Sequence, residues 1–172
     1  VNDRTNEFRR SSYYLTCDRV NGVLTVYTDS TMRIPIKTIR VSVGKAGTET
    51  PTGTWTMHRA GRWQELMGPS WGQYGTHVVN GIFVHSVACG QANSYNLPVG
   101  EYLRLGNPAS HGCIRACVAD AKWVWDNCNG SKIHIFDGTY TSNEALKGPL
   151  GRKALTPLRG SKNFDPTDPA CK

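Results

Sequence analysis

Apolar and polar residues alternate through much of the first half of the chain, and this alternation constrains the fold more than any other feature. In the clearest run, residues 32–43, polar residues are interleaved with Ile34, Ile36, Ile39, Val41 and Val43. A side-chain period of two indicates a β-strand that is buried on one face. Pro35 within this run indicates a sheet edge or a β-bulge, because proline cannot donate to a strand ladder.

Two further strands are predicted at residues 13–17 and 23–27. Asn21-Gly22 lies between them and is the strongest short signal for a β-hairpin. Short strands are also expected at 55–58, at 78–84 with a break at Asn80-Gly81, at 102–105 and at 132–136. Residues 59–76 mix aromatic, glycine and polar residues too irregularly to predict a periodic element.

One segment has a helical period. From Ile114, apolar residues recur along one face of a 3.6-residue period as far as Cys128, and Asn129-Gly130 supplies a stop. The 18 glycines and 9 prolines argue against a helical bundle. The residues therefore predict a mainly β fold with one short helix.

The chain divides into three parts by composition. Residues 1–11 are polar and basic and are expected to be frayed, and residues 12–137 carry the strands and the helix. Residues 138–172 hold four of the nine prolines and no long apolar period, which predicts an extended tail packed on the domain. No stretch approaches 18 uninterrupted apolar residues, so no membrane span is expected.

The net charge of +7 favours an anionic partner. The basic residues are scattered and match no nucleic-acid-binding motif, so nucleic acid is not expected as a partner. Two interpretations of the charge stay open, namely a solvated basic surface and an acidic polymer as the substrate.

Six cysteines are present, but no C-x-x-C pair occurs. A metal site is not expected, because the spacings match no common zinc motif among His85, Cys89, His111, Cys113 and Cys117. If one cysteine stays free as a nucleophile, the other five allow at most two disulfides. Their connectivity is open, although Cys171 is a plausible tether for the tail.

The stretch SHGCIR at 110–115 carries the clearest chemical signal. Cys113 before a helix is a candidate nucleophile, because the helix N-terminus favours thiolate and would lower the pKa. Neighbouring N–H groups could hold an oxyanion, and Gly112 allows close approach to a substrate carbonyl. Arg115 could bind a substrate carboxylate, the alternative being a structural ion pair with Asp120.

A nucleophilic cysteine needs a base, and both His85 and His111 are candidates. Ser86 could orient the ring of His85. Cys117 and Cys128 fall on the apolar stripe of the helix, where burial or a disulfide is expected in place of catalysis.

Four ordered segments resemble the L,D-transpeptidase catalytic domain of the YkuD type. They are VGKAGTETPTGTW at 43–55, HSVACG at 85–90, SHGCIR at 110–115 and ADAKWVWDN at 119–127. The resemblance covers residues 12–137 and implies a β-sandwich with a short helix after the nucleophile loop. NFDPTDP at 163–169 is similar to C-terminal extensions of some secreted members, and no role is assigned to it.

The resemblance also implies a reaction. Cys113 would attack a stem tetrapeptide of peptidoglycan, release the terminal D-Ala and form a thioester, and an amine from a second stem would complete a 3→3 cross-link. His85 matches the base and the Ser86 carbonyl its orienting partner, while Ser110, His111 and Gly112 surround the oxyanion site. Arg115 and Ser110 are expected to bind substrate. The resemblance implies acylation by some β-lactams, no metal or cofactor, and an extracytoplasmic location.

Two alternatives remain open. The same Cys-His pair could pass the thioester to water, which would make the chain an L,D-carboxypeptidase or a cross-link hydrolase. A basic, non-enzymatic wall-binding module would need no nucleophile. The spacer between His85 and Ser110 holds 24 residues, longer than is common in the family, and this departure could alter the substrate channel.

Overall fold

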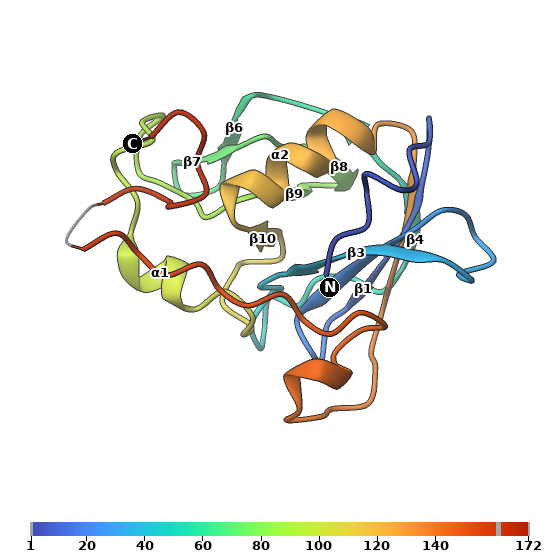
Figure 1. Ribbon diagram of the computed structural model, residues 1–172. Helices are drawn as coiled ribbons and strands as arrows, with labels where there is room; N and C mark the ends of the chain where they lie inside the picture. The colour runs from blue at the N-terminus through green and yellow to red at the C-terminus, as the bar shows by residue number, and fades with distance from the viewer. Residues whose placement is uncertain (1, 161–162, 172) are drawn as a thin grey trace.

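The computed structural model describes residues 2–160 and 163–171, and its strands form two main sheets and a separate hairpin (Figure 1). The first sheet has the order β3-β2-β1-β11-β4, and these strands are Pro35–Arg40, Val23–Tyr27, Tyr14–Asp18, Lys132–Phe136 and Gly53–Thr56. The second sheet has the order β10-β9-β8-β5, and these strands are Ile114–Ala116, Ile82–Ser86, Thr76–Val79 and His58–Arg59. The hairpin pairs β6, Trp63–Leu66, with β7, Ser70–Gln73.

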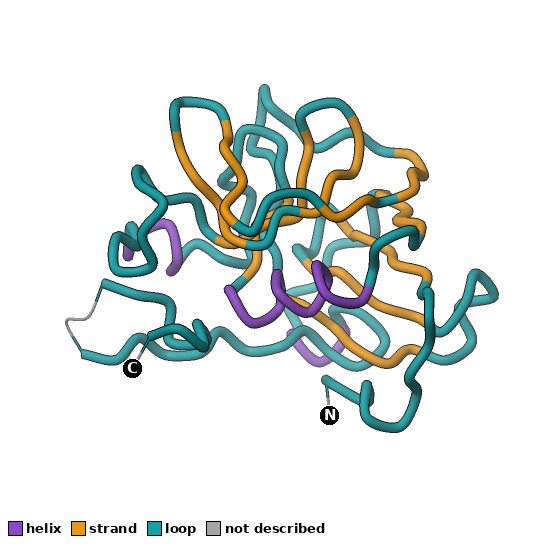
Figure 2. The backbone as a smooth tube through the Cα atoms, turned by 90° about the horizontal axis from the view of Figure 1, so that it is seen from above, coloured by secondary structure: helices purple, strands orange, loops and turns teal. Residues whose placement is uncertain are grey.

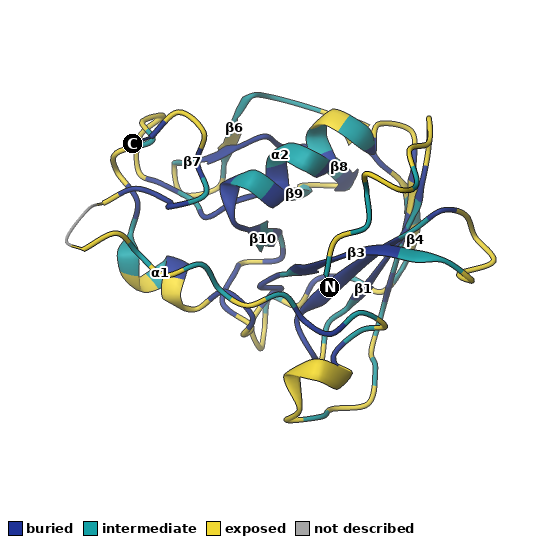
Figure 3. Ribbon diagram, viewed as in Figure 1, coloured by how far each residue is buried: buried dark blue, intermediate teal, exposed yellow. Residues whose placement is uncertain are grey.

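The main hydrophobic core joins both sheets to one helix, α2 (Val118–Asn127). Leu15 and Ile39 enter it from the first sheet, Val84 and Ile114 from the second, and Val124 from α2. Figure 3 shows this interior in dark blue, whereas the outer loops are largely exposed. The prediction of a mainly β fold is therefore confirmed.

The first hairpin also agrees with its prediction. Strands β1 and β2 pair antiparallel, and Gly22 in their turn has a φ of 62°. A side chain at Gly22 would be strained at this φ, and its Cβ would lie 2.5 Å from the carbonyl oxygen of Gly106. Pro35 lies on the edge strand β3, beside a register shift at Tyr27, which is where a missing N–H is tolerated.

Three predictions of local structure were wrong. Residues 59–76, expected to be irregular, contain the β6–β7 hairpin. The strand expected at 102–105 is replaced by a short helix, α1 (Val99–Leu103), whose Tyr102 is buried and donates a hydrogen bond to the carbonyl of Thr156. The long helix begins at Val118 and not at Ile114, because Ile114–Ala116 pairs with β9 as β10. Ile114 and Ala116 fit a period of two as well as the start of a helical period.

Both ends of the described chain pack on the domain. The N–H of Thr38 donates to the carbonyl of Asn2 at 2.9 Å, so this part of the N-terminal segment is not frayed. After β11 and a short 3-10 helix, η1 (Glu144–Leu146), the tail runs as a loop along one side of the molecule (Figure 2). Arg152 of the tail is buried and donates to the carbonyls of Asn21 and Gly106.

All six cysteines lie within the described residues, and all are free thiols. Cys171 is buried, but the tether expected of it is not a disulfide in this structure. Among the described residues, no helix combines the length and the apolar composition needed to cross a membrane.

Candidate active site

The candidate catalytic residues lie on two neighbouring parallel strands, β9 and β10. Arg115 is the register partner of His85, and Ile114 is the partner of Val84. Cys113 therefore lies beside Phe83, one residue before the paired segment. Because side chains alternate along a strand, all four of Cys113, Arg115, Phe83 and His85 belong to one face of the sheet.

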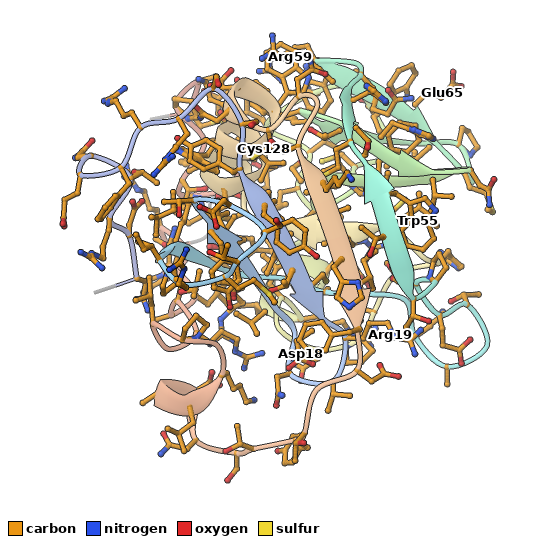
Figure 4. The ribbon with its side chains drawn as sticks, turned by 90° about the vertical axis from the view of Figure 1, so that its right-hand side faces the viewer. Asp18, Arg19, Trp55, Arg59, Glu65 and Cys128 are labelled. Atoms are coloured by element: carbon orange, nitrogen blue, oxygen red, sulfur yellow. The ribbon has the colours of Figure 1, made fainter. Side chains whose placement is uncertain are left out.

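This face lines a cavity of about 410 Å³. The cavity is also lined by the nucleophile loop and by the β6–β7 hairpin, through Glu65, Leu66, Met67, Ser70, Gly81, Ile82, Ala88, Ser110 and His111. Glu65, labelled in Figure 4, marks the hairpin side of the molecule. A partly apolar cavity with a few convergent polar groups is the usual form of a small-molecule or peptide site.

Cys113 is partly exposed, and its thiol lies against the β8–β9 turn. The Sγ accepts a hydrogen bond from the N–H of Phe83 at 3.4 Å and is 3.5 Å from the carbonyl oxygen of Gly81. Burial raises the pKa of the Cys113 thiol. The prediction that this pKa is lowered was therefore wrong. The reason is geometric, since α2 begins only at Val118 and its positive end is not at Cys113.

His85 is buried, with 1% of its surface exposed. Its Nδ1 is hydrogen-bonded to the carbonyl of Ser86. A carbonyl only accepts, so Nδ1 carries the proton and Nε2 is left as an acceptor. Burial lowers the pKa of His85 to about 4, and the neighbouring charge of Arg115 contributes to the lowering. At neutral pH the ring is therefore neutral and able to take a proton.

The turn before Cys113 is held by Ser110. Its Oγ donates to the carbonyl of Cys113 at 2.6 Å and accepts from the N–H of Gly112 at 3.1 Å. Ser110 is 1% exposed and its hydroxyl is committed to this turn, which argues against the expected contact with substrate. Gly112 has a φ of 129°, and a Cβ there would lie 2.8 Å from Cδ1 of Ile82, so glycine is required.

A loop after β3 supports the same turn from the other side. Thr50 Oγ1 donates to the carbonyl of Gly112 at 2.7 Å and accepts from the N–H of Gly44 at 2.9 Å. The guanidinium of Arg19 donates to the carbonyl of Thr50 and pairs with Asp137 at 2.7 Å. Figure 4 shows Arg19 at the end of β1, so the first sheet fixes the position of the nucleophile turn.

His111 is exposed and lies on the cavity wall, without the buried carbonyl contact that orients His85. The backbone N–H groups of His111 and Cys113 donate no hydrogen bond within the described part of the chain. These two donors are available for an oxyanion, whereas that of Gly112 is already used by Ser110.

Arg115 pairs with Glu101 on α1 at 2.9 Å and not with Asp120, the structural partner considered from the sequence. Its side chain is 13% exposed, and its Nε is buried without a hydrogen-bond partner among the described residues. The guanidinium therefore keeps donor capacity while it lies on the cavity wall. No group of three or more His, Cys, Asp or Glu side chains in residues 2–160 and 163–171 is arranged to hold a metal ion.

Sequence reasoning missed two residues that position His85, Gly72 and Gln73 on β7. A Cβ at Gly72 would lie 2.5 Å from Nδ1 of His85, so the ring packs directly on this backbone. The N–H of Gln73 donates to the Oγ of Ser86 at 2.8 Å. Both residues lie in the segment for which no periodic element was expected, and nothing in its local pattern points to the base.

Comparison with known proteins agrees with this fold. A family model described as the L,D-transpeptidase catalytic domain, YkuD, matches residues 12–144. A stretch of 27 residues is 59% identical to YciB of Bacillus subtilis (strain 168), whose name assigns it to the L,D-transpeptidases; it covers 16% of this chain and 14% of that protein.

Solved structures show the same fold. An L,D-transpeptidase from Mycobacterium tuberculosis H37Rv is 19% identical with a TM-score of 0.58, over 73% of this chain and 58% of that chain. The LD transpeptidase LdtMt1, solved in complex with imipenem, is 21% identical with a TM-score of 0.55. The match covers 73% of this chain and 59% of that chain. This chain thus spans little more than half the length of these relatives.

The mainly β fold and a cavity lined by both a cysteine and a buried, oriented histidine stand beside this match to the family model. The chain belongs to the L,D-transpeptidase catalytic domain family, YkuD.

Proposed function

We propose that this chain is a cysteine acyltransferase that forms 3→3 cross-links between peptidoglycan stems. One observation carries the proposal: the β9–β10 register places Cys113 and His85 on one face of the same cavity, with the ring neutral and its Nε2 free to accept a proton. Family membership supports an enzyme of this kind.

In the proposed first half-reaction, Sγ of Cys113 attacks the carbonyl that joins the third stem residue to the terminal D-Ala. His85 Nε2 takes the thiol proton as the C–S bond forms, so no free thiolate is needed beforehand. This order fits a thiol whose pKa is raised by burial and a base whose pKa is lowered. The N–H groups of His111 and Cys113 hold the oxyanion, and the imidazolium returns its proton to the nitrogen of D-Ala as the C–N bond breaks.

In the second half-reaction an amine of a neighbouring stem attacks the thioester. His85 takes a proton from this amine, the new amide forms, and the C–S bond breaks to restore the thiol of Cys113. Arg115 offers a positive charge on the cavity wall for a carboxylate of the donor stem. The net charge of +7 favours binding to an anionic wall polymer. Action on such a polymer would place the chain outside the cytoplasm.

The same nucleophile is proposed to react with some β-lactams, as is consistent with the imipenem complex of LdtMt1. Cys113 would attack the carbonyl of the strained β-lactam ring and form a thioester as the C–N bond of the ring breaks. The amine that is released stays attached to the acyl group, so nothing leaves the adduct.

The test is incubation with purified disaccharide-tetrapeptide, followed by mass spectrometry of the products. A cross-linked dimer with one D-Ala lost per bond is expected. Tripeptide alone would assign the chain to the hydrolases that use the same Cys-His pair, and unchanged substrate would favour a wall-binding module. A Cys113→Ala variant is the matched control, since it removes the nucleophile and leaves the charge unchanged.

A further inference from the structure

The segment Asp165-Pro166-Thr167-Asp168 of the C-terminal tail binds two elements of the catalytic domain. The N-cap residue of α2, Cys117, donates its thiol to the carboxylate of Asp120 at 3.1 Å, and its side chain caps no backbone N–H of the helix. The tail supplies this cap instead, because Asp165 accepts from the N–H of Val118 at 2.8 Å and Thr167 accepts from that of Ala119 at 3.1 Å. The segment is thereby fixed at the N-terminus of α2.

Asp168 continues this contact to β7. It is 3% exposed, and its Oδ2 accepts a hydrogen bond from Nε2 of Gln73 at 2.9 Å. Gln73 is also 3% exposed, and its Oε1 accepts from Nη1 of Arg62 at 2.9 Å. An arginine donor on one side and an aspartate acceptor on the other fix the amide in one orientation. Figure 1 shows the C-terminal end of the tail beside β7.

The backbone around Gln73 in turn determines where His85 lies. The N–H of Gln73 donates to Oγ of Ser86, whose carbonyl holds Nδ1 of His85. Gly72, the preceding residue, packs against the same ring nitrogen. A shift of this short stretch of β7 would move both the acceptor and the surface that orient the imidazole.

We propose that Asp168 is a positioning residue for His85, acting through Gln73 and Ser86, so that the C-terminal tail completes the active site. The proposal rests on the assignment of His85 as the base in the proposed function. Asp168 touches no reacting atom, and its effect is to keep the ring in the Nδ1–H tautomer that leaves Nε2 free for Cys113.

The test uses Asp168→Ala in the full chain with two readouts. The first is the tautomer of His85 from long-range nitrogen–proton NMR spectra, which is expected to change from pure Nδ1–H to a mixture. The second is the rate constant for alkylation of Cys113 by iodoacetamide, which is expected to fall about tenfold. This loss is smaller than the roughly 10²–10⁴-fold contribution of a general base, because the variant misplaces His85 without removing it. The amplitude of alkylation reports the folded fraction separately from this rate constant.

Asp168→Asn keeps an oxygen that can accept from Gln73, so it is expected to restore most of the rate constant. Thr167→Val is the matched control, because it removes a hydrogen bond of the same segment to α2 and leaves the bond between Asp168 and Gln73. This variant is expected to unfold at a lower temperature with an unchanged rate constant. If Asp168→Ala does not fold, the pair Gln73→Met with Asp168→Leu removes both partners of the buried Gln73–Asp168 hydrogen bond together. This pair also removes the acceptors of the Arg62 guanidinium and of the Ala170 N–H, both of which are only partly buried.

A wild-type tautomer together with a wild-type rate constant in Asp168→Ala, or in the paired variant, would overturn the proposal. Equal losses in Thr167→Val and Asp168→Ala would also overturn it, since the effect would then follow tail docking in general. Neither readout needs peptidoglycan turnover, so a negative product assay would refute the proposed function while this result stands by itself.

Discussion

Arg115 and His85 are direct register partners in the parallel ladder between β10 and β9. The pairing places a permanent positive charge beside a buried imidazole, and burial together with this charge lowers the pKa of His85 to about 4. The imidazole of His85 is therefore neutral at neutral pH. Cys113 directly precedes β10, so one short pairing positions the proposed nucleophile, the proposed base and a cation.

Cys113→Ser is expected to abolish covalent labelling by a carbapenem, because a hydroxyl is a far weaker nucleophile than a thiol. Cys89→Ala is the matched control, since burial raises the pKa of the Cys89 thiol to about 11 and makes it unreactive. Intact-protein mass spectrometry measures the adduct. Labelling of Cys113→Ser at the wild-type rate would move the chemistry to another cysteine.

His85→Ala is expected to lower the rate of thioester formation by about 10²–10⁴-fold, the usual contribution of a general base. His111→Ala is expected to cost much less, because His111 lies exposed on the cavity wall. The wild-type rate should fall at low pH only as His85 becomes protonated, near pH 4. Stopped-flow acylation across pH 3.5–8 measures both effects, and a larger loss in His111→Ala would reverse the two roles.

Folding stability should also depend on His85. Its pKa of about 4 in the folded state lies below the ordinary value of 6.5. Between these values the unfolded chain binds a proton that the folded chain does not, so the free energy of unfolding falls as the pH falls from about 6.5 to about 4. The contribution is up to about 3 kcal/mol. Urea unfolding measured across this pH range should show a smaller fall in the free energy of unfolding for His85→Gln than for wild type. Parallel plots of this free energy against pH for the two proteins would contradict this account.

Arg115→Ala is expected to lower kcat/KM at least several-fold with a tetrapeptide donor, since charged hydrogen bonds contribute about 1.5–3 kcal/mol. Arg115→Lys should restore only part of kcat/KM, because lysine lacks the planar guanidinium that can donate two parallel hydrogen bonds to a carboxylate. Glu101→Gln is the matched control, as it removes the ion pair with Arg115 and leaves the guanidinium in place. A loss of Tm with an unchanged kcat/KM in the folded fraction of Arg115→Ala would make Arg115 structural.

The strands near the N-terminus could be predicted because local chemistry determines them. Asn21-Gly22 specifies its own turn, and the alternation around Ile36 and Ile39 fits one buried sheet face. The start of the helix was misplaced because Ile114 and Ala116 fit both periods, and only pairing with β9 decides between them. Because the helix was predicted to begin directly after Cys113, the pKa of this thiol was wrongly expected to be lowered.

The candidate site was accessible from sequence only where its residues are contiguous or carry a known pattern. Cys113 and His85 were found in this way. Gly72, Gln73 and Asp168 were missed because the tertiary fold makes their contacts, which are those of Gly72 with His85, of Gln73 with Ser86 and of Asp168 with Gln73. A glycine or glutamine in an irregular segment gives no local signal. The acidic residues of the DPTD segment were visible in the sequence, but their partners on α2 and β7 were not.

The most direct test of the central claim is the mass of the acyl-enzyme formed in the first turnover. Wild-type protein is mixed with disaccharide-tetrapeptide, quenched in acid within the first turnover, digested and mapped by mass spectrometry. The account predicts that the peptide containing Cys113 gains the mass of the donor less D-alanine, and that free D-alanine appears in equal amount. Release of D-alanine at the wild-type rate by Cys113→Ala, with no adduct on any cysteine, would contradict it.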